Sequence, residues 1–274
     1  MYMAKTNFDI LNPEHPIFNK LISENPEWWQ ILKNDSEIYI DVRKGNYLNA
    51  YYNGGSILKI KLSKTKEFEA ETHYKYQNQS LNQTLKSPYI KYNLKDINLN
   101  TVASFKTAIK NSQSVESEKK IQGQMIISLS SKYLDSEFAY NDNGKLIRID
   151  MVKLKDRKIV FEELKRIQDG RLITNMYENG EPEILSQVKT YNEFIKSHKD
   201  ELKKYYAKIF KLKAKLGLLP VAIKDIRDID EYTISDKVEL FIEPYSDGKI
   251  NSQRNRRIKA MKEIYTNNQI IHNL

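Results

Sequence analysis

The sequence predicts a mixed α/β fold in which a β-rich N-terminal module precedes a larger α/β domain. Alternating apolar and polar residues, broken by Asn-Gly turns, predict strand hairpins at residues 38–62 and 136–165. Apolar residues at spacings of three and four predict helices before and after the second group of strands. An apolar segment at 238–242 predicts a further strand. The second domain therefore has the predicted order helix, three strands, helix, strand.

The N-terminal module is expected to span residues 1–110 and to serve target recognition or partner contacts. Asn, Gln, Ser and Leu are frequent over residues 77–101, which predicts a loop or linker region. The expected helices are residues 16–24 and 26–34, and the expected strands are 38–43, 47–52 and 56–62.

The second domain is expected to span residues 111–274. Its first helix is predicted to begin with Ser114 as N-cap and to run to about residue 133. The later elements are predicted as strands at 136–140, 145–154 and 158–165, a helix from Pro182 to Leu216 with a break near Ser197, strands at 219–223 and 238–242, and a basic helix at 253–265.

Composition and motifs exclude several classes of protein. The chain of 274 residues has no cysteine, which excludes thiolate zinc sites, iron–sulfur clusters and a cysteine nucleophile. It has no P-loop, dinucleotide fingerprint, His-Glu-x-x-His or nucleophile elbow. The apolar runs are too short for a membrane span, and the N-terminus does not resemble a signal peptide. We therefore expect a cytoplasmic protein without a membrane partner.

Positive charge is concentrated in two segments. Of 45 Lys and Arg against 36 Asp and Glu, nine lysines lie within residues 189–215 beside three acids. Residues 249–262 hold six basic residues and no acid. These segments are either solvated helix faces or a surface that follows the phosphates of a nucleic acid.

Two carboxylates and a lysine are predicted to meet in the hairpin of the second domain. Glu163 and Lys165 end a strand and point the same way, because strand side chains alternate. Asp150, in the preceding strand, can approach Glu163 across the hairpin. Adjacent carboxylates repel each other, and a divalent cation such as Mg²⁺ relieves this repulsion. With a lysine to orient or deprotonate water, these are the parts needed to hydrolyse a phosphodiester.

These residues resemble the PD-(D/E)XK nuclease superfamily. Asp150 matches the strand aspartate, although no proline precedes it, and Glu163-Leu164-Lys165 matches the E-x-K element. Gln187 and Tyr191 match the Q-x-x-x-Y element of the branch that includes lambda exonuclease and RecB-type nucleases. The resemblance covers about residues 112–245. Acid-x-Lys occurs five times in the chain, but only the Glu163 copy ends a strand-like run.

The resemblance implies a restriction-endonuclease-like αβββαβ core and a Mg²⁺-dependent deoxyribonuclease for which Mn²⁺ can substitute. In that family Asp150 and Glu163 would hold the metal, and either Glu118 or Glu137 would add a third acid. Gln187 and Tyr191 would steady the site or contact the scissile strand. DNA is the implied partner, plausibly in restriction or anti-phage defence, within a homodimer or a defence complex.

Two other classes of function compete with this interpretation. A nuclease fold that has lost catalysis would bind nucleic acid without needing a metal. Alternatively, the apolar stripe from Tyr191 to Leu216 steps by four and three residues, which is typical of a coiled-coil dimer seam in an interaction protein.

Overall fold

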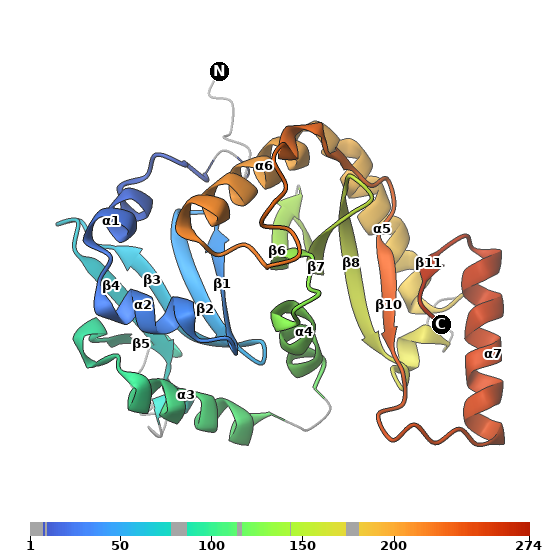
Figure 1. Cartoon of the computed structure of the whole chain (residues 1–274). Coiled ribbons are helices and arrows are strands. Elements are labelled where there is room, and N and C mark those ends of the chain that lie inside the picture. The colour runs from blue at the N-terminus through green and yellow to red at the C-terminus, as the bar shows by residue number, and fades with distance from the viewer. Residues whose placement is uncertain (1–7, 9, 78–86, 114–116, 143, 174–180) are drawn as a thin grey trace. The chain divides into compact units, whose positions relative to one another are not determined.

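The structure is a computed structural model that describes the chain except for residues 1–7, 9, 78–86, 114–116, 143 and 174–180 (Figure 1). It divides into two compact units. The first unit contains Met1–Lys132 and Tyr205–Arg227, and the second contains Tyr133–Lys204 and Asp228–Leu274. Residues 111–132, which the sequence places in the second domain, thus group with the first unit.

The first unit is built on an antiparallel sheet in the order β1-β2-β3-β4-β5, as far as the described residues show. Its elements are α1 (Pro16–Glu24), α2 (Glu27–Asn34), β1 (Ile38–Arg43), β2 (Tyr47–Tyr52), β3 (Gly55–Leu62), β4 (Phe68–His73), η1 (Tyr74–Gln77), β5 (Tyr89–Tyr92), η2 (Leu94–Asp96), α3 (Leu99–Ser112) and α4 (Glu118–Ile127). The two predicted helices and the first three predicted strands are confirmed.

The expected loop over residues 77–101 is wrong in part, because β5, η2 and the first turn of α3 lie within it. β5 is an edge strand with no buried residue, so it lacks the apolar alternation that reveals a strand. The start of α3 does carry a signal: Asn98 and Thr101 form a reciprocal capping box. Ser114 lies outside the described residues, and the N-cap of α4 is Ser117.

Gly123 of α4 lies against the turn between β2 and β3. A Cβ added to Gly123 would lie 2.6 Å from the Gly54 nitrogen and 2.7 Å from Asn53 Cα. We expect Gly123→Ala to lower the free energy of unfolding by about 1–3 kcal/mol, because backbone must move to admit the methyl group. Chemical denaturation measures this. The exposed neighbour Gln124, changed to alanine, should alter stability by less than about 0.5 kcal/mol. Equal losses in both variants would contradict the close approach.

The second unit is built on a mixed sheet whose described strands follow the order β11-β10-β8-β7-β6, with β9 pairing to β8. β6, β7 and β8 pair antiparallel, and β10 lies parallel to β8. The elements are β6 (Tyr133–Asp142), β7 (Lys145–Lys155), β8 (Lys158–Arg166), η3 (Gly170–Leu172), α5 (Glu183–Ser197), α6 (Lys199–Leu216, which from Tyr205 on belongs to the first unit), η4 (Ile229–Glu231), β9 (Thr233–Ile234), β10 (Glu239–Glu243), α7 (Ser252–Asn267) and β11 (Ile271–His272). The mixed α/β fold is therefore confirmed.

The long helical segment breaks at His198, between α5 and α6, as the sequence predicts near Ser197. The predicted strand at 219–223 is wrong. Pro220 lies in this segment, Ile223 N–H donates to the Pro220 carbonyl in a turn, and Val221 is 61% exposed. The apolar stripe that predicted a coiled-coil seam is already buried in the single chain. Its buried members include Leu202, Ile209, Leu212 and Leu216.

One apolar cluster of the second unit joins both helices that flank its sheet. Figure 1 shows α5 and α7 beside the strands β8, β10 and β11. The buried members of the cluster are Ile167, Leu172, Ile184, Leu185, Val188, Leu240, Ile242, Met261 and Tyr265. This packing fixes α7 against the end of β8. No helix in the described part of the chain is long and apolar enough to cross a membrane.

Candidate active site

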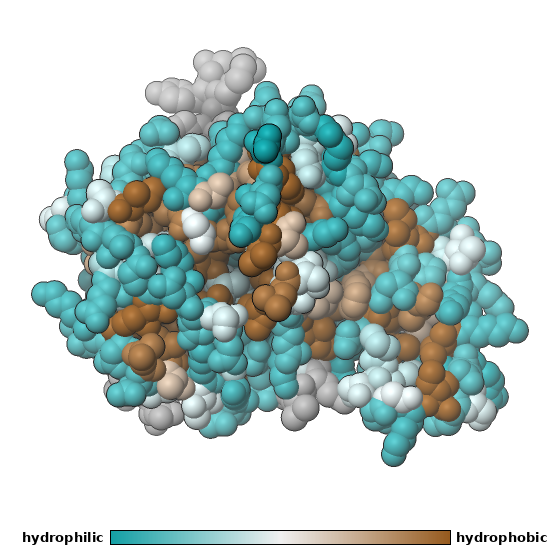
Figure 2. Space-filling model, in the orientation of Figure 1, coloured by the Kyte–Doolittle hydropathy of each residue, from teal (hydrophilic) through white to brown (hydrophobic). Residues whose placement is uncertain are grey.

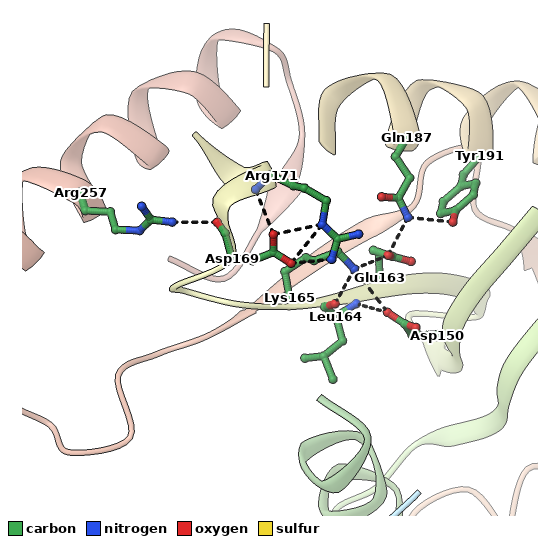
Figure 3. A network of polar contacts seen from close by, with 9 residues as sticks. All are labelled: Asp150, Glu163, Leu164, Lys165, Asp169, Arg171, Gln187, Tyr191 and Arg257. Atoms are coloured by element: carbon green, nitrogen blue, oxygen red, sulfur yellow. Dashed lines mark hydrogen bonds and ion pairs between the residues drawn. The ribbon is translucent and has the colours of Figure 1, made fainter. Parts of the chain in front are cut away.

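Two neighbouring strands bring the predicted acids and lysine together. In the register of β7 with β8, Met151 lies opposite Glu162, so Asp150 and Glu163 are the next residues along the two strands. The backbone N–H of Leu164 donates to Asp150 Oδ2 at 2.8 Å, which fixes the aspartate side chain against the backbone of β8. Lys165 Nζ lies 2.5 Å from Glu163 Oε1 and 3.9 Å from Asp150 Oδ2. One ammonium group therefore faces both carboxylates (Figure 3).

Both carboxylic acids of the pair have raised pKa values, although Lys165 faces them. The side chain of Glu163 is only 3% exposed and that of Lys165 only 4%, whereas that of Asp150 is 38% exposed. Burial, and then the negative charge of Asp150, raise the pKa of Glu163 to about 7. Burial also raises the pKa of Asp150, although the charge of Lys165 and the Leu164 N–H oppose the rise. Burial is the largest cause of both shifts, and a positive charge beside these acids would favour their ionised forms.

Helix α5 supplies the predicted Gln187 and Tyr191. Gln187 Nε2 donates to Glu163 Oε1 and to the Tyr191 hydroxyl, each at 2.8 Å. The two residues are one helical turn apart, so both face the sheet (Figure 3). Burial and the nearby Glu163 charge raise the pKa of Tyr191 to about 12, which keeps its hydroxyl protonated. Gln187 thus contacts Glu163 directly, and Tyr191 contacts Gln187.

One oxygen of this network has the character of a cation ligand. Glu163 Oε1 bonds to Lys165 and Gln187, whereas Oε2 is buried and has no hydrogen-bond partner among the described residues. A buried carboxylate oxygen without a partner is costly. Asp150 and Glu163 together offer the one or two carboxylates, with water and phosphate completing the shell, that Mg²⁺ prefers. The residues therefore fit the implied metal.

The third predicted acid is not brought into a ligand set. Within the part of the chain that the structure describes, no three His, Asp or Glu side chains gather to hold a metal ion. Glu137 belongs to β6, where its neighbours Ser136 and Phe138 pair with Met151 and Ile149, and its charge raises the pKa of Asp150. Its side chain is exposed. Glu118 begins α4 in the first unit, so its part in the site stays a prediction.

A second buried glutamate lies on the opposite face of β8. Glu162 is adjacent to Glu163, and its residue is 1% exposed. Tyr133 Oη donates to Glu162 Oε1 at 2.5 Å, and Lys153 pairs with Glu162 Oε2. Lys153 also lies 2.8 Å from Glu239 Oε2. Both oxygens of Glu162 are thus bonded, in contrast to those of Glu163, which indicates a structural ion pair.

Sequence reasoning missed a group of residues beside the predicted site. Asp169 and Arg171 follow the end of β8, and Arg171 bonds to Asp169 through Nε at 3.0 Å and Nη2 at 2.5 Å. Arg257 of α7 donates to the carbonyls of Ile167 and Asp169 at 2.7 and 2.8 Å. The sequence shows Arg257 as one of the basic residues of 249–262 and a turn signal, Asp169-Gly170, shortly after the E-x-K strand, but it does not indicate that the two meet.

The two basic segments are only partly free to meet a phosphate. Lys213 is buried in an ion pair with Asp41, and Arg257 is held at the turn after β8. Exposed basic residues nevertheless line α7 and the loop before it, and Figure 2 shows hydrophilic side chains along the outer edge of this helix. These exposed residues are Lys249, Arg256, Lys259 and Lys262.

Comparison with models of protein families, with curated proteins and with solved structures found no match for this chain. The geometry of the site therefore carries the functional argument alone.

Proposed function

We propose that the protein is a divalent-metal-dependent nuclease of the PD-(D/E)XK type that hydrolyses phosphodiester bonds of DNA. The observation that carries the proposal is the buried, unpartnered Oε2 of Glu163 beside Asp150 and Lys165. An ion pair that served stability alone would satisfy both carboxylate oxygens, as the Glu162 network on the other face does.

Each residue of the site has a role in this proposal. Asp150 and Glu163 would hold the cation, which would supply a water of lowered pKa and a positive charge for a phosphate oxygen. Lys165, fixed by Glu163 Oε1 and by the Leu164 carbonyl at 2.9 Å, would orient the attacking water through its positive charge. Gln187 holds Glu163 in place, and Tyr191 holds Gln187.

The order of elements supports the same proposal. Three antiparallel strands, β6 to β8, are followed by α5 and then by β10, which lies parallel to β8. With α4 ahead of them, these elements follow the order that a restriction-endonuclease-like core requires. A cytoplasmic role in restriction or anti-phage defence belongs to the proposal by analogy of fold.

The test is cleavage of DNA by the purified full chain. Supercoiled, linear duplex and single-stranded DNA are each incubated with Mg²⁺, Mn²⁺ or EDTA. We expect cleavage of at least one substrate with either metal and none with EDTA. Salt-sensitive binding without cleavage under every condition would overturn the nuclease proposal and support a binding module instead.

Metal binding should also be visible as a change in stability. We expect Mg²⁺ at about 100 times its dissociation constant to stabilise the wild type by about 2.7 kcal/mol. Glu163→Gln should lose this effect, yet be at least as stable as the wild type without metal, because the amide removes the cost of burying the Glu163 charge and also its repulsion with Asp150. Glu162→Gln should keep the metal effect. Thermal unfolding with and without EDTA measures all three proteins, and equal stabilisation of the Glu163 variant would exclude this carboxylate as a ligand.

A further inference from the structure

The turn after β8 carries an arginine that is held in a fixed direction. The carboxylate of Asp169 accepts from the backbone N–H of Arg171 at 2.9 Å and also from its guanidinium, through Nε at 3.0 Å and Nη2 at 2.5 Å. Burial tends to raise the pKa of Asp169, but these bonds outweigh it and lower the pKa. An arginine held in this way loses little further freedom when it binds a ligand.

Helix α7 holds both ends of this turn. Arg257 donates to the carbonyls of Ile167 and Asp169 ahead of η3, and the Tyr265 hydroxyl donates to the Leu172 carbonyl at its end, at 2.8 Å. Arg257 and Tyr265 are eight residues apart, which places them on the same side of the helix. The C-terminal helix therefore fixes the backbone from which Arg171 projects.

Arg171 shares the electrostatic field of the proposed active site. Its positive charge opposes the burial that raises the pKa of Asp150, and the charge of Lys165 helps to lower the pKa of Asp169. Figure 3 shows the Arg171 side chain beside Lys165, on the same side of β8 as Glu163. Lys165 is 4% exposed and is engaged by Glu163, whereas the side chain of Arg171 is 38% exposed. Of these two cations, Arg171 is the one that an incoming anion can reach.

A purely structural role does not account for this arrangement. A partly exposed ion pair between residues two apart adds at most a small amount to stability. Two side chains of α7, distant in sequence, nevertheless hold the carbonyls around it. The guanidinium of arginine carries five N–H donors, and Asp169 engages those of Nε and Nη2, so Arg171 has more donors than this ion pair uses.

We propose that Arg171 binds a non-bridging phosphate oxygen of the DNA strand in the active site, and that Arg257 is a positioning residue that acts through the turn after β8. The inference rests on the proposed nuclease function and deepens it. It assigns phosphate recognition to this turn, and it gives α7 the role of holding the turn in place.

The experiment measures the rate of DNA cleavage and, separately, the affinity for DNA. The affinity is measured with Ca²⁺ as the probe cation, so that binding is followed without turnover. We expect Arg171→Ala to lower kcat/KM at least about 30-fold and to reduce the slope of log K against log salt by about 0.9, the loss of one phosphate contact. Arg171→Lys should recover part of both, because it restores the charge but not the fork. Metal-dependent thermal stabilisation should not fall in either variant, since Arg171 does not hold the cation.

Arg257→Ala is expected to lower kcat/KM about 10-fold and to reduce the salt slope as Arg171→Ala does. Because it acts through Arg171, the double variant should be no worse than Arg171→Ala alone. Arg157→Ala is the matched control, since Arg157 pairs with Glu231 at the opposite end of β8 and should leave cleavage and slope unchanged. If the Arg257 variant is folded and the double variant loses more kcat/KM than Arg171→Ala alone, the positioning role is contradicted.

The two proposals fail in different ways. If Arg171→Ala and Arg171→Lys keep full cleavage and the wild-type salt slope while Glu163→Gln is inactive, the inference about Arg171 is wrong and the nuclease proposal stands. If the wild type cleaves no DNA with any metal, the nuclease proposal fails. The salt slope then decides alone whether Arg171 contacts phosphate, because binding needs no turnover.

Discussion

Replacing Glu163 by glutamine is expected to lower metal-dependent DNA cleavage by about 1000-fold or more. The substitution preserves shape, and the Gln187 contact can persist, but the charge that would hold the cation is lost. A bound metal contributes several kcal/mol to transition-state stabilisation, and each 1.36 kcal/mol corresponds to a factor of ten in rate. Initial rates of plasmid cleavage in Mg²⁺ measure the effect.

The adjacent glutamate provides the control for this prediction. Glu162 is as deeply buried as Glu163 and is likewise paired with a lysine, but it belongs to the network of Tyr133 and Lys153 on the opposite face of β8. Glu162→Gln should destabilise the protein and leave the cleavage rate of the folded fraction within about threefold of wild type, because it touches no group of the site. If both variants lose activity equally, or if Glu163→Gln keeps it, the assignment of the active face is wrong.

The largest effect on stability is expected in the first unit, at Lys213. Lys213 Nζ lies 2.5 Å from Asp41 Oδ1, and the two side chains are 5% and 2% exposed. Arg43 Nη2 holds the other oxygen of Asp41 at 2.9 Å. Lys213→Met removes one of the two charged side chains that hold the buried carboxylate of Asp41. We therefore expect a loss of about 3 kcal/mol in the free energy of unfolding. Urea denaturation of the full chain measures it.

Lys215 is the matched control for this substitution. It lies two residues further along α6, is exposed, and donates to Asn19 Oδ1 at 2.8 Å. Lys215→Met should therefore change stability by less than about 0.5 kcal/mol. A Lys213 variant as stable as wild type would show that the pair contributes nothing.

Local patterns predict the strands β6, β7, β8 and β10 of the second unit and the side-by-side placement of Asp150, Glu163 and Lys165. Apolar alternation and the turn at residues 141–144 define β6, β7 and β8 to within a few residues, and strand periodicity puts Glu163 and Lys165 on one face. The spacing of Gln187 and Tyr191 predicts that they share a helix face, and the structure places Gln187 on Glu163. These predictions succeed because each depends on residues that are close in sequence.

The features that the sequence does not predict depend on distant contacts. Arg257 meets the turn after β8 across 90 and 88 positions, and Lys213 meets Asp41 across 172. Nothing in a run of basic residues distinguishes a lysine that will be buried from one that will face solvent. For the same reason, the positive charge of residues 189–215 overstates the surface available to a phosphate.

The most direct test of the central claim is a crystal of the wild-type protein soaked with Mn²⁺ and measured for anomalous scattering. The proposal predicts a Mn²⁺ ion bound by Asp150 and by Glu163 Oε2, at about 2.0–2.3 Å from each oxygen. Two results would contradict the claim. One is the absence of an ion between these carboxylates at a Mn²⁺ concentration that supports cleavage, and the other is an ion bound elsewhere that accounts for the cleavage.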